Sequence, residues 1–250
     1  MLFRSLLLSG EGPSDIGCCN PALDSCDANN FKAGPMAHFV DKLIEEFQGY
    51  EMSHIATERV SFVSESYLSA HKQKPASKKS MFIRGKHNPP ETHYYFKNAR
   101  ALAVAAKQKA IEVNDNVIAV LFRDADGTAS AERGNWQDKY NSIRSGFAVE
   151  SYGLGVAMLP NPKSEAWLLC AVKPNAYQHC EALEQESGND RSANPLKIQL
   201  ERALNNNAST LQINELMHDN TIDVLRIDMP SYNTFKADLE GAVRLAVGIP

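Results

Sequence analysis

Five acidic residues in three separate segments have the types and spacing that a hard metal ion needs. Glu11 and Asp15 lie in "EGPSD", Asp124 and Asp126 in "RDADGT", and Glu165 in "PKSEAWLL". Carboxylates gathered at one place repel one another unless a cation neutralises them, and an all-oxygen set suits Mg²⁺ or Mn²⁺ better than Zn²⁺. Two such ions about 4 Å apart activate a water and stabilise the leaving oxygen of a phosphodiester. The pattern therefore predicts phosphoryl or phosphodiester chemistry with one or two ions.

Ordinary structural roles compete with metal binding at each of these positions. An Asp that follows a strand commonly caps a helix or occupies a turn, which is an alternative for Asp15. Glu165 could lie in the first turn of a helix, where it would interact favourably with the helix dipole. The pair of Asp124 and Asp126 comes just after six apolar residues, and this context favours a site.

The surrounding sequence alternates between strand and helix patterns over roughly the first 170 residues. Short apolar runs predict strands at 2–8, 117–122 and 155–159. Helical spacing predicts helices at 36–47, 98–113, 135–147, from 164 onward, and at 195–205, 211–218 and 231–247. The loop-like composition of 17–35 predicts no element, and 53–70 fits either a strand or a helix.

This alternation predicts an α/β fold, with a largely parallel, Rossmann-like sheet flanked by helices and a mainly helical C-terminal portion. We expect one α/β domain over 1–172, with a basic insertion around 60–97. A helical extension over 173–250 should pack on the same domain. Because the carboxyl ends of parallel strands meet at one edge of a sheet, the three acidic motifs should converge there.

A run of basic residues without any acid lies between the first two acidic motifs. Its members are Lys72, Lys74, Lys78, Lys79, Arg84 and Lys86. Such residues neutralise backbone phosphates, which dominate nucleic-acid affinity, and the aromatic residues at 94–96 could stack on bases. A solvated loop followed by core aromatics explains the same pattern, so both interpretations stay open.

Composition limits the other functional classes. The net charge of −4 attracts no nucleic acid globally, so such a contact must use a local patch. Five cysteines, with Cys18 and Cys19 adjacent, match no secreted disulfide framework, so we expect unpaired thiols and a cytoplasmic location. Zinc binding by Cys18, Cys19, Cys26 and His38 matches no compact motif. The chain lacks a signal-peptide pattern and any apolar run of membrane-spanning length, so we expect no membrane partner.

The ordered motifs resemble the Toprim domain, and are most similar to the nuclease branch found in OLD-type proteins and small stand-alone bacterial Toprim-like proteins. The family pattern is E-G-x-x-D after the first strand, then D-x-D, then a further acid. Glu11, Asp15, Asp124, Asp126 and Glu165 match it position by position over residues 6 to about 170. The interval between the first two motifs is longer than the pattern expects, and the basic insertion would account for it.

The resemblance implies a Toprim-like catalytic domain and a divalent-metal nuclease whose acids bind one or two Mg²⁺ or Mn²⁺ ions. Such nucleases also tend to carry a late lysine that contacts the scissile phosphate. Lys236, in "SYNTFKADL", is the candidate, and Lys163 and Lys197 are alternatives. Small proteins of this type often act beside an ATPase in defence against phage. The implied partners are therefore nucleic acid, DNA in the first instance, and an ABC- or AAA-type ATPase.

A second resemblance competes with the first. "VLFRDADGTAS" is similar to the first motif of HAD phosphatases, in which Asp124 would be the nucleophile, Asp126 the general acid and Thr128 a phosphate contact. Asp219 and Asp223 would then form the late acidic pair that holds Mg²⁺. That motif normally lies near the start of a chain, and this hypothesis gives the first and third acidic motifs no role. A third hypothesis is a catalytically silent module that binds metal or nucleic acid.

Overall fold

A mostly parallel sheet lies at the centre of the molecule. The computed structural model describes residues 5–73, 90–125 and 135–248. Within these residues the main sheet has five strands in the order β3-β5-β1-β6-β7. The parallel strands are β1 (Ser5–Gly10), β5 (Val60–Ser64), β6 (Val117–Phe122) and β7 (Gly155–Met158), and β3 (Ser25–Cys26) pairs antiparallel with β5. The predicted α/β class with a largely parallel sheet is confirmed.

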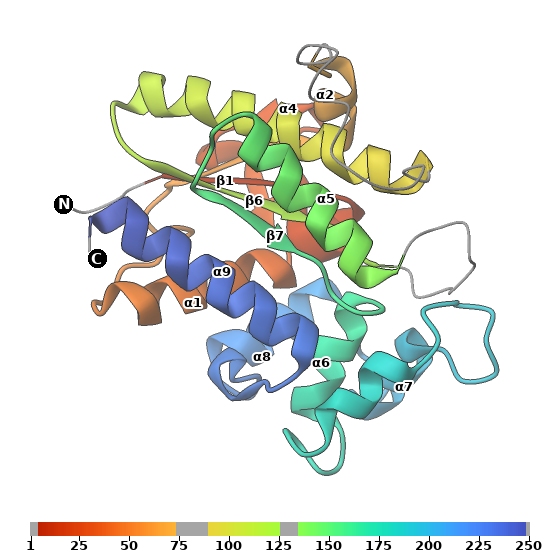
Figure 1. Ribbon diagram of the computed structural model, residues 1–250. Helices are drawn as coiled ribbons and strands as arrows, with labels where there is room; N and C mark the ends of the chain where they lie inside the picture. Colours follow the sequence, from red (N-terminus) through yellow and green to blue (C-terminus); the bar gives the residue numbers. More distant parts are fainter. Residues whose placement is uncertain (1–4, 74–89, 126–134, 249–250) are drawn as a thin grey trace.

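Helices cover both faces of this sheet (Figure 1). Helix α1 (Pro35–Gln48) and helix α9 (Pro230–Val247) cover one face. Helix α4 (Pro90–Val113), helix α5 (Trp136–Val149) and the short α2 (Glu65–Ala70) cover the other. Successive residues of β1 therefore enter different cores: Leu6 and Leu8 pack with α1, and Leu7 packs with α4. A strand buried on both faces needs a continuous apolar run, and the sequence has one.

The C-terminal helices pack on the α1 face. They are α6 (Ser164–Val172), α7 (Leu196–Ala203), α8 (Thr210–His218) and α9. Trp167 of α6 is fully buried, stacks on Phe39 of α1 and Phe235 of α9, and donates its Nε1 hydrogen to Ser231 at 2.9 Å. This aromatic cluster fixes the start of α6, where the third acidic motif lies, against the sheet.

Two segments differ from the sequence-based expectation. Residues 17–35 contain a two-stranded antiparallel sheet of β2 (Gly17–Cys19) and β4 (Phe31–Ala33), rather than an irregular loop. Residues 53–70 contain both a strand, β5, and a helix, α2, with Ser64 as the helix N-cap. Short helical turns complete the chain at η1 (Gly12–Ile16), η2 (Ala28–Asn30), η3 (Cys180–Gln185) and η4 (Val224–Arg226).

The cysteines are mostly paired. Cys19 is bonded to Cys26, and Cys170 to Cys180, which leaves Cys18 as the free thiol. The expectation of unpaired thiols is wrong, because spacing along the chain does not reveal which cysteines the fold brings together. The predicted cytoplasmic location loses this support and stays a prediction. Across the described ranges, no helix has the length and apolar character needed to span a membrane.

Candidate active site

The order of the strands reverses at β1, and the candidate site lies at this reversal. From β1 the chain passes through α1 to β5, which pairs with one side of β1. From β5 it passes through α4, on the opposite face of the sheet, to β6, which pairs with the other side of β1. Ligands of open α/β sheets bind outside the carboxyl ends of the strands at such a point. Gly10 pairs with Phe122 across the ends of β1 and β6, and a Cβ on Gly10 would lie 2.5 Å from the Phe122 carbonyl oxygen. Glu11 follows Gly10 directly, and Arg123 and Asp124 follow Phe122, so the first two acidic motifs leave the sheet at neighbouring strand ends.

Ser164 connects two of the acidic motifs at the start of α6. Its hydroxyl donates to Oδ1 of Asp15 at 2.7 Å, and its backbone N–H donates to Oδ1 of Asp124 at 2.9 Å. Gly12 allows Asp15 to fold back, because its φ is +80° and a Cβ there would lie 2.4 Å from Oδ2 of Asp15. Glu165 follows Ser164 directly. The structure thus brings acidic residues that follow β1, β6 and β7 to one edge of the sheet.

Burial and neighbouring charges raise the pKa of two of these acids, Asp124 and Glu165. Burial raises the pKa of Asp124 well above its usual range, and the charges of Glu165, Asp15 and Glu11 add to the effect against the opposing Ser164 hydrogen bond. Burial also raises the pKa of Glu165, and Asp15 adds to this shift while Lys163 opposes it. Ionisation of the whole set is therefore costly unless a proton or a cation compensates the charge.

The side chains present fit part of the ligand set of a hard cation. Oε2 of Glu165 is buried and has no hydrogen-bond partner in the described part of the chain, so a carboxylate oxygen is left for a ligand. The donors of Asp15, Asp124 and Glu165 are all oxygens, as Mg²⁺ prefers. However, the described residues contain no group of three His, Cys, Asp or Glu side chains already close enough to hold an ion. Asp126, the remaining acid of the predicted set, lies outside the described residues.

Arg123 is a site residue that the sequence analysis did not single out. Its guanidinium lies 3.3 Å from Oε2 of Glu11 and 2.7 Å from Oε1 of Glu65, and it lies over the ring of Tyr94 at 4.3 Å. Burial and the hydrogen bond to Glu65 raise the pKa of Tyr94 to about 12. Arg123 therefore neutralises Glu11, and a metal ion would compete with it for that carboxylate. The sequence feature that could have identified Arg123 is its position between the apolar run of β6 and Asp124.

Of the three lysines proposed to contact phosphate, Lys197 is exposed on α7, and the other two lie in different surroundings. Lys163 pairs with Asp190 at 2.9 Å. Burial lowers its pKa, but Asp190, Glu165 and Asp124 more than offset this and raise it. Lys236 instead donates to the Leu225 carbonyl oxygen of η4 at 3.4 Å. Lys163 is therefore the lysine that responds to the charge of the acidic cluster, the name used below for Asp15, Asp124 and Glu165.

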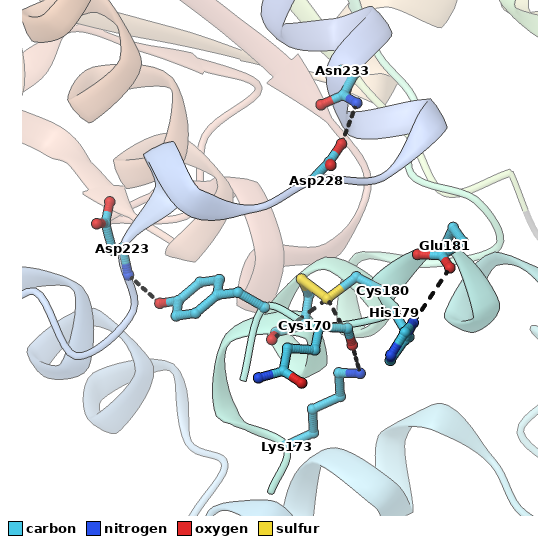
Figure 2. Close-up of a disulfide and its surroundings, with 10 residues drawn as sticks. Cys170, Lys173, His179, Cys180, Glu181, Asp223, Asp228 and Asn233 are labelled. Carbon is cyan, nitrogen blue, oxygen red and sulfur yellow. Dashed lines mark hydrogen bonds and ion pairs between the residues drawn. A yellow bond between two sulfur atoms is a disulfide. The ribbon is translucent and has the colours of Figure 1, made fainter. Parts of the chain in front are cut away.

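The far end of α6 is held by a disulfide. Figure 2 shows Cys170, in the last turns of α6, bonded to Cys180 of η3. Lys173 donates to the Gln178 carbonyl oxygen within the same loop, and the hydroxyl of Tyr177 accepts from the backbone N–H of Asp223 at 2.8 Å. The helix that presents Ser164 and Glu165 is therefore anchored at both ends.

The other predicted residues are placed as follows. Asp219 and Asp223 accept hydrogen bonds from the backbone N–H groups of Thr221 and Leu225, so both stabilise local turns after α8. Lys72 is exposed just after α2. Tyr95 is buried and donates to the Asp124 carbonyl oxygen at 3.1 Å, so it supports the site from α4. Outside the described residues lie Lys74, Lys78, Lys79, Arg84, Lys86 and Thr128.

No protein-family model, curated protein or solved structure matches this chain.

Proposed function

We propose that the protein is a divalent-metal-dependent nuclease that hydrolyses phosphodiester bonds. The observation that carries the proposal is the joint placement of Asp15, Asp124 and Glu165 around Ser164. These acids come from three separate segments, and burial and mutual repulsion raise the pKa of both Asp124 and Glu165. The fold holds these mutually repelling acids together at the strand reversal of an α/β sheet. Binding a cation is the simplest physical explanation for this arrangement.

Each residue has a proposed role. Asp15, Asp124 and Glu165 hold Mg²⁺ or Mn²⁺ together with Asp126, and Glu11 joins them when it exchanges Arg123 for the cation. The ion, when bound, polarises a phosphoryl oxygen and lowers the pKa of a water. Ser164 orients two of the carboxylates. Lys163 is placed to offset negative charge on the phosphate, a role that the motif pattern alone assigns to Lys236.

The resemblance to Toprim nucleases supports the same activity and extends it. Under this proposal Lys72 and the other basic residues of the run between the first two acidic motifs contact the phosphates of DNA, because neutralising them yields most of the affinity. An ATPase partner and a role in phage defence follow from the resemblance alone.

The test is incubation of the purified protein with plasmid DNA and with oligonucleotides in Mg²⁺ or Mn²⁺. We expect cleavage that chelation stops and that Asp124→Asn abolishes. Asp228→Asn is the matched control and should cleave normally. Asp228 lies in the turn before α9 and accepts a hydrogen bond from Asn233 of that helix. Cleavage that survives Asp124→Asn would contradict the assignment.

A phosphate monoester offered in parallel separates the HAD-like alternative. The HAD hypothesis needs Asp219 and Asp223 to hold Mg²⁺, but both carboxylates accept hydrogen bonds from backbone N–H groups in local turns. We therefore expect no monoester turnover. Monoester turnover without DNA cleavage would favour the phosphatase instead, and neither activity would favour a binding module.

A further inference from the structure

A cavity of about 470 Å³ lies on the opposite side of β1 from the acidic cluster. It is formed at the carboxyl ends of β1 and β5 and by the loop that follows β2. Its lining includes Gly10, Pro13, Cys19, Leu23, Phe62 and Ser64. This volume falls within the range of about 300–1,000 Å³ that is typical of ligand pockets.

The cavity shares a wall with the candidate active site. Gly10, Gly12 and Pro13 line it, and Glu11 is the residue that they bracket. The turn η1, which begins at Gly12, continues to Asp15, the acid held by Ser164. A group bound in the cavity would therefore lie next to the acidic cluster, separated from it by the backbone at the end of β1.

The lining has the chemistry of a site for an uncharged, flat group with a polar edge. Phe62 and Cys19 contribute buried apolar surface, and Leu23 contributes a side chain that is 54% exposed. Ser64 and Asp24 add the polar edge, with the Ser64 hydroxyl donating to Oδ1 of Asp24 at 3.0 Å. The residues that line the cavity include Asp24 but no lysine or arginine, so it does not suit a phosphate.

We propose that this cavity receives one unstacked base of a single-stranded nucleic acid whose adjoining phosphate reaches the acidic cluster. The inference rests on the proposed nuclease activity and names its substrate class. A base enters such a cavity only when it is free of its stack and its partner strand, as in single strands, loops and frayed ends. Apolar contact with its faces and an acceptor such as Asp24 at its edge would hold it.

Binding measured without turnover tests this proposal. All proteins in the experiment carry Asp124→Asn, which prevents cleavage, and fluorescence anisotropy in Mn²⁺ reports the Kd of a labelled short single strand and of the same sequence as a duplex. Leu23→Ala removes an exposed apolar contact, so the fold should be unaffected. We expect it to weaken single-strand binding roughly fivefold and to leave duplex binding unchanged. Ala22→Trp, which places a bulky ring at another lining position, should weaken it further.

The control is Leu245→Ala, which truncates a similarly exposed leucine near the end of α9. Equal single-strand Kd values for the Leu23 and Leu245 variants would overturn the proposal, as would equal binding of single strand and duplex. Failure of the nuclease activity is distinguishable, because cleavage is assayed separately in proteins that keep Asp124, and Leu23-dependent binding by a chain that cleaves nothing in that assay refutes only the activity. Efficient cleavage that is indifferent to Leu23 refutes only the cavity assignment.

Discussion

The hydroxyl of Ser164 lies 2.7 Å from Oδ1 of Asp15, although 149 positions separate the two residues along the chain. Ser164 is fully buried, and its backbone N–H is used by Asp124 at the end of β6. One small residue thus links acids from the ends of β1 and β6 to the helix that follows β7. The positions of the carboxylates therefore depend on one another, and a change at Ser164 should alter the positions of all of them.

Ser164→Ala should weaken metal binding more than it weakens the fold. The variant keeps the N–H donor to Asp124 but removes the donor to Oδ1 of Asp15, whose Oδ2 still accepts from the Ser14 hydroxyl. Loss of such an orienting hydrogen bond lowers metal affinity by about 10- to 100-fold and stability by about 1 kcal/mol. Titration calorimetry with Mn²⁺ and urea unfolding measure the two effects. Ser231→Ala is the control, because it removes a buried hydroxyl that pairs with Trp167 away from the acids. Equal Mn²⁺ affinity in both variants would rule out the orienting role.

Asp124→Asn should stabilise the metal-free protein while abolishing cleavage. Asparagine keeps an oxygen acceptor for the Ser164 N–H but removes the charge that Glu165 and Asp15 repel. We expect the free energy of unfolding to rise near neutral pH, because asparagine avoids the cost of keeping this buried carboxyl either charged or protonated. The comparison is Asp219→Asn, where a hydrogen bond from Thr221 lowers the pKa of an exposed acid, so no gain should follow. A destabilised Asp124→Asn protein would contradict this account.

The raised pKa values of Asp124 and Glu165 set the sign of a pH dependence. In the folded state these carboxyls hold protons more tightly than in the unfolded chain. Their contribution to stability is therefore fully present below the ordinary carboxyl pKa of about 4, and is lost as the pH rises through the raised values. A cation replaces the missing proton, so Mn²⁺ should raise Tm more at about pH 8 than at about pH 5. Thermal scans of the wild type and of a double variant, Asp124→Asn with Glu165→Gln, measure this. A Mn²⁺ effect of equal size at both pH values in the wild type would refute the linkage.

The sequence predicted the elements that local pattern determines. The apolar run 117–122 corresponds residue for residue to β6, because every side chain of that strand is buried. The short strands β2 and β4 escaped notice because each has only three residues and pairs with the other across an intervening loop. Local composition does not indicate which short segments pair with one another.

The candidate site was predictable to a similar extent. The motifs located the acids, because the ends of parallel strands share an edge. The partners of those acids were not predictable, since the ion pairs of Arg123 with Glu11 and Glu65 join three strand ends that only the folded chain brings together. Lys163 and Lys236 were equally eligible by type, and only their surroundings in the fold separate them.

Arg123→Lys should destabilise the protein despite keeping the charge. A lysine offers a single ammonium group in place of the planar fork that contacts Glu11 and Glu65 and lies over Tyr94. The partly buried carboxylates would lose a partner, which costs about 1–3 kcal/mol in urea unfolding. Arg144→Lys is the matched control, because Arg144 pairs with Asp238 and lies near the ring of Tyr140 with a more exposed side chain. That change should cost less than about 1 kcal/mol. Similar losses in both variants would remove any special role for Arg123.

Lys163→Ala and Lys236→Ala distinguish the two candidates for the phosphate contact. The Lys163 ammonium responds to the field of Glu165 and Asp124, and it would release Asp190 to meet a phosphate that carries developing charge. Removing a group that stabilises such charge costs about 100-fold in kcat, whereas truncating Lys236, which bonds to the Leu225 carbonyl oxygen, should leave kcat near the wild-type value. Steady-state cleavage of a labelled oligonucleotide, with Mn²⁺ affinity measured in parallel, separates loss of the phosphate contact from loss of metal. A larger fall in kcat for Lys236→Ala would return the role to the lysine that the motif pattern favoured, and would require α9 to approach the acidic cluster when substrate binds.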